Sequence, residues 1–85
     1  MMILDAAQMN EKAQAHRYLA EMLALPDYYG RNLDALYDCL TDLGETEIRF
    51  VNLEEAGGTY FSRVLSVFRE AEIDNPKLHL FYDFI

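Results

Sequence analysis

The stretch from Leu25 to Gly44 reads LPDYYGRNLDALYDCLTDLG and combines a turn with a helix. Pro26 stops any helix that precedes it, because proline lacks the backbone donor that a helix interior needs. Gly30 predicts a turn in which positive φ is accessible. Asn32 is a typical helix N-cap, and the apolar residues after it recur at helical spacing as far as Gly44. The stretch therefore predicts a loop followed by an amphipathic helix whose apolar stripe is Leu33, Leu36, Tyr37, Leu40 and Leu43.

The sequence on both sides of this stretch predicts alternating strands and helices. Parallel pairing follows, because strands separated by long helical segments cannot pair as hairpins. We expect an α/β fold with a three-stranded parallel sheet in the order 1-2-3, covered by helices, in a single domain over residues 1–85. The predicted strands are Met1 to Leu4, Thr46 to Leu53 and Leu78 to Phe84. The other predicted helices run from a cap at Asn10 to about Leu23, for one turn at Leu53 to Ala56, and from Thr59 to the break at Asn75 and Pro76.

Composition places the chain among globular proteins with an acidic surface. It has 85 residues, 52% of them hydrophobic, and 15 acidic against 7 basic side chains give a formal net charge of −8. This balance argues against nucleic acid or an anionic membrane as a partner, and it favours either a cationic partner or simple solubility. The single cysteine, Cys39, precludes an internal disulfide, and no export signal is visible, so we expect a cytoplasmic protein. Asp38 beside Cys39 should raise the pKa of its thiol, as expected of a packing residue.

Three aspartates line one face of the helix in the opening stretch. Asp34, Asp38 and Asp42 are spaced four residues apart, so their carboxylates follow one another over about 12 Å. Each adjacent pair of like charges costs about 0.2–0.5 kcal/mol in an isolated helix. A solvated helix face usually alternates its charges, whereas only Arg31 opposes the acids in this region. The row is consistent with an ordinary solvated face or with a surface for a basic partner.

Aromatic residues favour the binding interpretation. Tyr28 and Tyr29 lie in the loop before the acidic face, where burial for packing is harder to arrange, and tyrosine is enriched at interfaces. Two carboxylates could also act as acid and base in glycoside hydrolysis or hold a divalent metal. Both alternatives are disfavoured, since the domain is too small for a substrate cleft and Asp42 is too far from Asp34 to share an ion. We expect no catalytic residue, no cofactor and no metal. For His16 and His79 we expect structural roles.

Two segments resemble the barstar family, the intracellular protein inhibitors of the ribonuclease barnase. The first is LPDYYGRNLDALYDCLT at residues 25–41, and the second is VLSVFREA at residues 64–71, which is similar to the last helix of that family. The order of elements along the whole chain agrees with this resemblance. The first segment is specific, because it is too long and too mixed in chemistry to arise from helical patterning alone.

The resemblance implies a set of partner-binding residues and a role for each. In these inhibitors, the helix and the loop before it enter the ribonuclease active site and their carboxylates replace RNA phosphates. By motif position, Asp38 would be the central anchor, and Asp34 would pair with a basic side chain beside it. The remaining expectations are that Tyr28 stacks on the enzyme, Gly30 permits close approach of the backbone, Asn32 fixes the loop, and Glu70 adds a carboxylate at the rim. Independently, the pattern of the last helix predicts that Glu70 is exposed.

Three residues depart from the family pattern and leave the target open. Tyr37 stands where barstar has a tryptophan, Arg31 where it has an acid, and Asp42 where it has a glycine. We count them with Tyr29 among the partner-binding candidates. The expected partner is a basic ribonuclease bound 1:1 by a monomeric inhibitor. The alternative is a barstar-fold interaction module with a partner that is not a nuclease.

Overall fold

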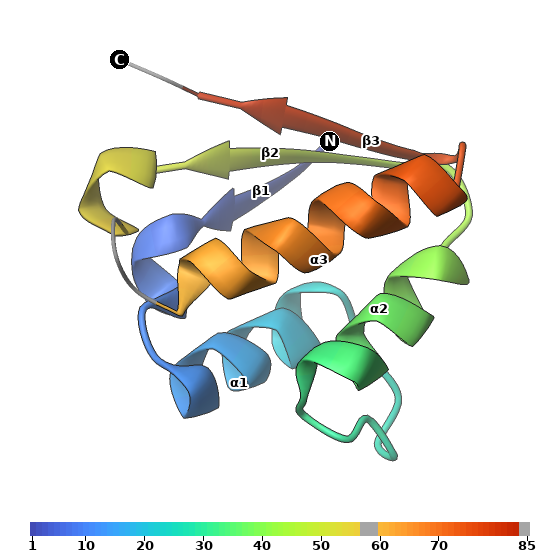
Figure 1. Ribbon diagram of the computed structural model, residues 1–85, viewed down its shortest axis with the longest axis horizontal. Helices are drawn as coiled ribbons and strands as arrows, with labels where there is room; N and C mark the ends of the chain where they lie inside the picture. The colour runs from blue at the N-terminus through green and yellow to red at the C-terminus, as the bar shows by residue number, and fades with distance from the viewer. Residues whose placement is uncertain (57–59, 84–85) are drawn as a thin grey trace.

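The computed structural model describes residues 1–56 and 60–83, except for the side chains of Glu55 and Ala56. Three parallel strands form one sheet in the order β1-β2-β3, as predicted. In Figure 1 the helices α1, α2 and α3 lie on the same side of this sheet, and α3 lies between the sheet and the other two. The elements are β1 (Met2–Asp5), η1 (Ala6–Met9), α1 (Lys12–Met22), α2 (Leu33–Thr41), β2 (Thr46–Val51), η2 (Leu53–Ala56), α3 (Phe61–Asp74) and β3 (Leu78–Tyr82).

Alternation along the strands determines which side chains enter the core. Ile48 and Phe50 of the central strand β2 are fully buried, whereas Arg49 between them is partly exposed. The Phe50 ring meets the rings of Phe61 and Phe68 of α3 edge to face, at centroid distances of 5.7 and 5.1 Å. These aromatic contacts fix α3 against the sheet, since each adds to the burial of apolar area.

Several predicted boundaries shift. Glu11, not Asn10, is the N-cap of α1, because the Glu11 side chain accepts the Gln14 amide at 3.2 Å. Helix α2 ends at Thr41 with Asp42 as its C-cap, short of Gly44. Strand β2 ends at Val51, and the short turn η2 has its predicted bounds. The predicted ends at Thr59 and Phe84 lie outside the described residues.

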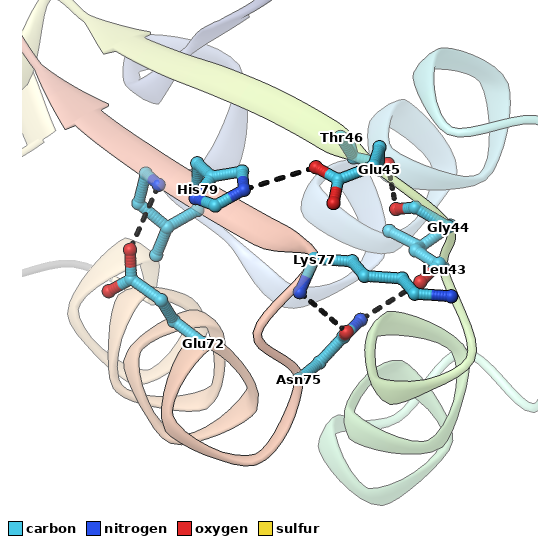
Figure 2. A network of polar contacts seen from close by, with 9 residues as sticks. Leu43, Gly44, Glu45, Thr46, Glu72, Asn75, Lys77 and His79 are labelled. Atoms are coloured by element: carbon cyan, nitrogen blue, oxygen red, sulfur yellow. Dashed lines mark hydrogen bonds and ion pairs between the residues drawn. The ribbon is translucent and has the colours of Figure 1, made fainter.

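A buried asparagine joins the end of α3 to the end of α2 (Figure 2). Asn75 is 5% exposed, and its amide donates to the carbonyls of Leu40 and Leu43, both at 3.0 Å. Its side-chain oxygen accepts the Lys77 amide at 3.0 Å. The Leu40 carbonyl also accepts the Leu43 amide, so Asn75 adds a second hydrogen bond there, and it supplies one to the Leu43 carbonyl just after α2. It also fixes the spacing between α2 and α3.

Replacing Asn75 with alanine should lower the free energy of unfolding by about 2–3 kcal/mol, because the Leu40 and Leu43 carbonyls and the Lys77 amide lose the hydrogen bonds that its side chain makes. Urea denaturation measures this loss. Ser66→Ala is the control: its exposed hydroxyl bonds only to the backbone of its own helix, and we expect a change within about 0.5 kcal/mol. Equal stabilities for the two variants would contradict a joining role for Asn75.

Candidate functional site

A groove between α2 and α3 brings three carboxylates together. It has a volume of about 300 Å³ and is lined by Leu33, Asp34, Tyr37 and Asp38 of α2 with Val67 and Glu70 of α3. We call this the acidic groove. Its walls include no basic side chain, so no cation that lines it offsets the three acids. Asp34, Asp38 and Glu70 are exposed, as the helical patterns predict, and the apolar side chains form its floor.

The partly buried Tyr37 ties the groove's two helices together. Its hydroxyl donates a hydrogen bond to the carboxylate of Asp74, the last residue of α3. This bond raises the pKa of Tyr37, and the nearby charges of Asp74, Glu70 and Asp38 act in the same direction. The phenol therefore stays neutral. Sequence reasoning did not find Asp74, because nothing in the local pattern of α3 indicates a partner 37 residues away.

The loop from Tyr28 to Asn32, called here the docking loop, is held at its junction with α2. The Asn32 side chain accepts the Ala35 amide at 2.8 Å and donates to the Gly30 carbonyl at 3.2 Å. Asn32 thus caps α2 and fixes the loop, as expected. A Cβ on Gly30 would lie 3.0 Å from the Asn32 side-chain nitrogen, so glycine leaves room for this bond.

Positive φ occurs one residue later than predicted. Arg31, not Gly30, has a left-handed backbone with φ of 53°. A non-glycine residue in this region costs roughly 1–2 kcal/mol. The Arg31 side chain lines hollows beside α1 together with Arg17, and it is absent from the lining of the acidic groove. The Arg31 charge, which was expected inside the docking loop, therefore lies on the side of that loop next to α1.

The two loop tyrosines have different environments. Tyr28 is 88% exposed and is available to a partner. Tyr29 is only 8% exposed, so the expectation that neither ring packs inside is wrong for Tyr29. A partner-binding role for Tyr29 stays a prediction, and in this structure its ring belongs to the core.

Tyr29 is buried because its hydroxyl reaches a buried histidine. The Nδ1 atom of His16, in α1, lies 2.5 Å from the Tyr29 hydroxyl, and its Nε2 lies 2.8 Å from the hydroxyl of Tyr60. His16 is 1% exposed. Burial, followed by the charges of Lys12 and Arg31, lowers its pKa. A neutral imidazole donates through one nitrogen and accepts through the other, so it suits two tyrosine hydroxyls.

Other candidates take structural or solvent positions. Asp42 is exposed at the C-cap of α2, outside the acidic groove, and His79 is exposed on β3 with Glu45 at 3.2 Å. Cys39 is half-buried, and burial together with Asp38 and Asp42 raises the pKa of its thiol, as predicted. Within residues 1–56 and 60–83, no group of three or more His, Cys, Asp or Glu is placed to hold a metal. No helix in that part is long and apolar enough to span a membrane.

The structure defines the class of this protein: a small parallel α/β domain with an acidic groove beside the docking loop. Two comparisons identify its family. The family model described as "Barstar (barnase inhibitor)" matches residues 1–83. A Bacillus subtilis (strain 168) protein named "Putative ribonuclease inhibitor YrdF" is 40% identical over 75 aligned residues, and the match covers 82% of each chain. The chain belongs to the barstar family.

The His16 contacts predict how stability depends on pH. Because the pKa of His16 is lowered in the folded chain, His16 binds a proton less readily there than in the unfolded chain, where its pKa is near 6.5. The corresponding stability is present above about pH 6.5 and is lost as the pH falls below it. We expect urea denaturation to show a decline in the free energy of unfolding between about pH 7 and about pH 5.5.

The same measurement on two variants isolates His16. His16→Gln should lose most of this decline, whereas His79→Gln, which removes an exposed histidine, should retain it. If His16→Gln kept the full decline, the pH dependence would come from other groups.

Proposed function

We propose that this protein inhibits a barnase-type ribonuclease by covering its basic active site. The acidic groove and the docking loop form the contact surface. The carboxylates of Asp34, Asp38 and Glu70 occupy the positions of RNA phosphates, and the exposed Tyr28 ring packs on the enzyme. One inhibitor binds one ribonuclease in the cytoplasm as a monomer, and neither nucleic acid nor a membrane is a partner.

The observation that carries this proposal is the convergence of the three carboxylates. Glu70 is distant in sequence from Asp34 and Asp38, yet it lines the same groove. A solvated surface does not require acids from two helices around one apolar floor. Uncompensated like charges raise the energy of the free protein, and a partner that carries arginine and lysine relieves this repulsion through charge-assisted hydrogen bonds. Membership of the barstar family supports a ribonuclease as that partner.

Inhibition of a basic protein partner also agrees with the side chains that line the groove, none of which is prepared for a reaction. Its titratable side chains are three exposed carboxylates and one hydrogen-bonded phenol. The Cys39 thiol, on the same helix, has a raised pKa, which disfavours the thiolate needed for nucleophilic chemistry. The groove is suited to binding cations rather than to transforming a substrate.

Barnase is the ribonuclease with which to test the proposal, by an RNA-cleavage assay and by titration calorimetry. We expect 1:1 binding and loss of RNA cleavage. Asp38→Ala should cost about 3–5 kcal/mol of binding free energy, because it leaves the partner's buried cations unpaired. Asp42→Ala is the matched control: it removes the same charge from the C-cap of α2, outside the acidic groove, and should change affinity by less than about 1 kcal/mol.

Failure of the wild-type chain to bind or inhibit barnase would refute inhibition of this class of enzyme. Equal losses for Asp38→Ala and Asp42→Ala would refute the phosphate-mimic mechanism while leaving inhibition intact. Capture from a lysate of a partner that is not a nuclease, with no effect on barnase, would favour the barstar-fold interaction module instead.

Salt provides a separate test of the electrostatic mechanism. The inhibitor is strongly acidic and the proposed active site is basic, so their long-range attraction should accelerate association. Raising the ionic strength from about 0.05 to about 0.5 M should slow association by roughly tenfold or more, with a smaller change in dissociation, because the Debye length shortens. Stopped-flow mixing with barnase measures both rates. An association rate that does not respond to salt would contradict charge attraction between the two surfaces.

A further inference from the structure

A second charged surface, basic rather than acidic, lies on the other side of the docking loop. A hollow of about 360 Å³ is lined by Lys12, Ala13, His16 and Arg17 of α1 and by Arg31 of the loop. We call it the basic hollow. Three of the chain's seven lysine and arginine residues surround it, although the chain as a whole is strongly acidic. His16, whose two ring nitrogens contact tyrosine hydroxyls, is buried beside these cations.

None of these three cations forms an ion pair within residues 1–56 and 60–83. In the part that the structure describes, the ion pairs join Arg49 to Asp83 and His79 to Glu45. Glu21 and Asp27 line a neighbouring hollow with Arg17 and Arg31, but neither acid comes within ion-pairing distance of them. The positive charge is therefore left for another molecule, or for solvent.

The backbone at Arg31 argues against a purely solvated role. Its φ of 53° favours glycine or asparagine, so an arginine here costs conformational energy. The Arg31 side chain lines a hollow with residues of α1 and is absent from the lining of the acidic groove, which holds Asp34 and Asp38. Strain of this kind is often found at binding sites, where it places a side chain for a partner.

The basic hollow is continuous with the proposed contact surface. Lys12 also lines a depression with Asn32, Leu33 and Asp34 at the start of α2 and with Tyr60 and Arg63 at the start of α3. A partner seated on the docking loop would therefore meet acids on one side of the loop and cations on the other. Complementarity then requires the opposite pattern on the partner.

We infer that the ribonuclease carries an acidic side chain that enters the basic hollow and pairs with Arg31, flanked by Lys12 and Arg17. This inference rests on the proposed function and adds a second contact of opposite sign to it. The contact determines specificity, because two charge pairs of opposite sign define the orientation of the complex, whereas a wholly basic face on the partner would be repelled at Arg31.

Measuring the affinity of charge-removing variants for barnase tests the inference, because long-range and local electrostatics predict opposite signs. Removing any cation makes the inhibitor more acidic, which should leave its attraction to a basic enzyme unchanged or strengthen it. If an acid of the partner enters the basic hollow, Arg31→Gln should instead weaken binding by about tenfold, mainly through faster dissociation. Arg17→Ala, on an exposed helical position, should weaken binding in the same direction.

Lys77→Ala is the matched control, because it removes one exposed positive charge outside the basic hollow. Its affinity should equal or exceed that of the wild type. Thermal unfolding confirms that each variant is folded. The inference would be overturned if Arg31→Gln and Arg17→Ala bound barnase as tightly as Lys77→Ala does. If Asp38→Ala still bound weakly, the proposed function would stand. Absence of wild-type binding would overturn the proposed function, and this inference with it.

Discussion

The hydrogen bonds of one buried imidazole hold the docking surface in place. His16 lies in α1, and its two ring nitrogens reach a tyrosine of the docking loop and another at the start of α3. Three segments distant in sequence are thereby fixed to one another. Asn75 fixes the opposite ends of α2 and α3. The acidic groove lies between these two sets of bonds, so its width depends on contacts that are not part of the contact surface itself.

Charge is distributed unevenly around this framework. The acids gather along α2 and at Glu70, while Lys12, Arg17 and Arg31 gather beside α1. Within one protein, pairing these groups with one another would be the more stable arrangement. In the part of the chain that the structure describes, these acids and cations form no ion pair with one another. Like charges that remain together lower stability modestly and make a surface selective for an oppositely charged partner.

Much of the fold could be predicted from the sequence, because local patterns determine it. The apolar spacing after Asn32 predicts α2, the N-cap residue predicts its start, and strands separated by helices predict parallel pairing. The exposure of Glu70 follows from the stripe of its own helix. The family resemblance agrees with the predicted order of elements and implies a role for each candidate residue, and the family comparison supports the resemblance.

One wrong prediction concerns a contact between segments distant in sequence, and another concerns the backbone of the docking loop. Tyr29 resembles an exposed loop residue until His16 and Tyr60 are brought beside it. Gly30 was predicted to take positive φ, but Arg31 takes the left-handed conformation instead. Glycine is needed at position 30 because a Cβ there would crowd the Asn32 side chain. Because the loop is already held in this shape before a partner arrives, few torsions remain to be frozen on association. In the proposed complex, such a preorganised loop would lose little conformational entropy on association.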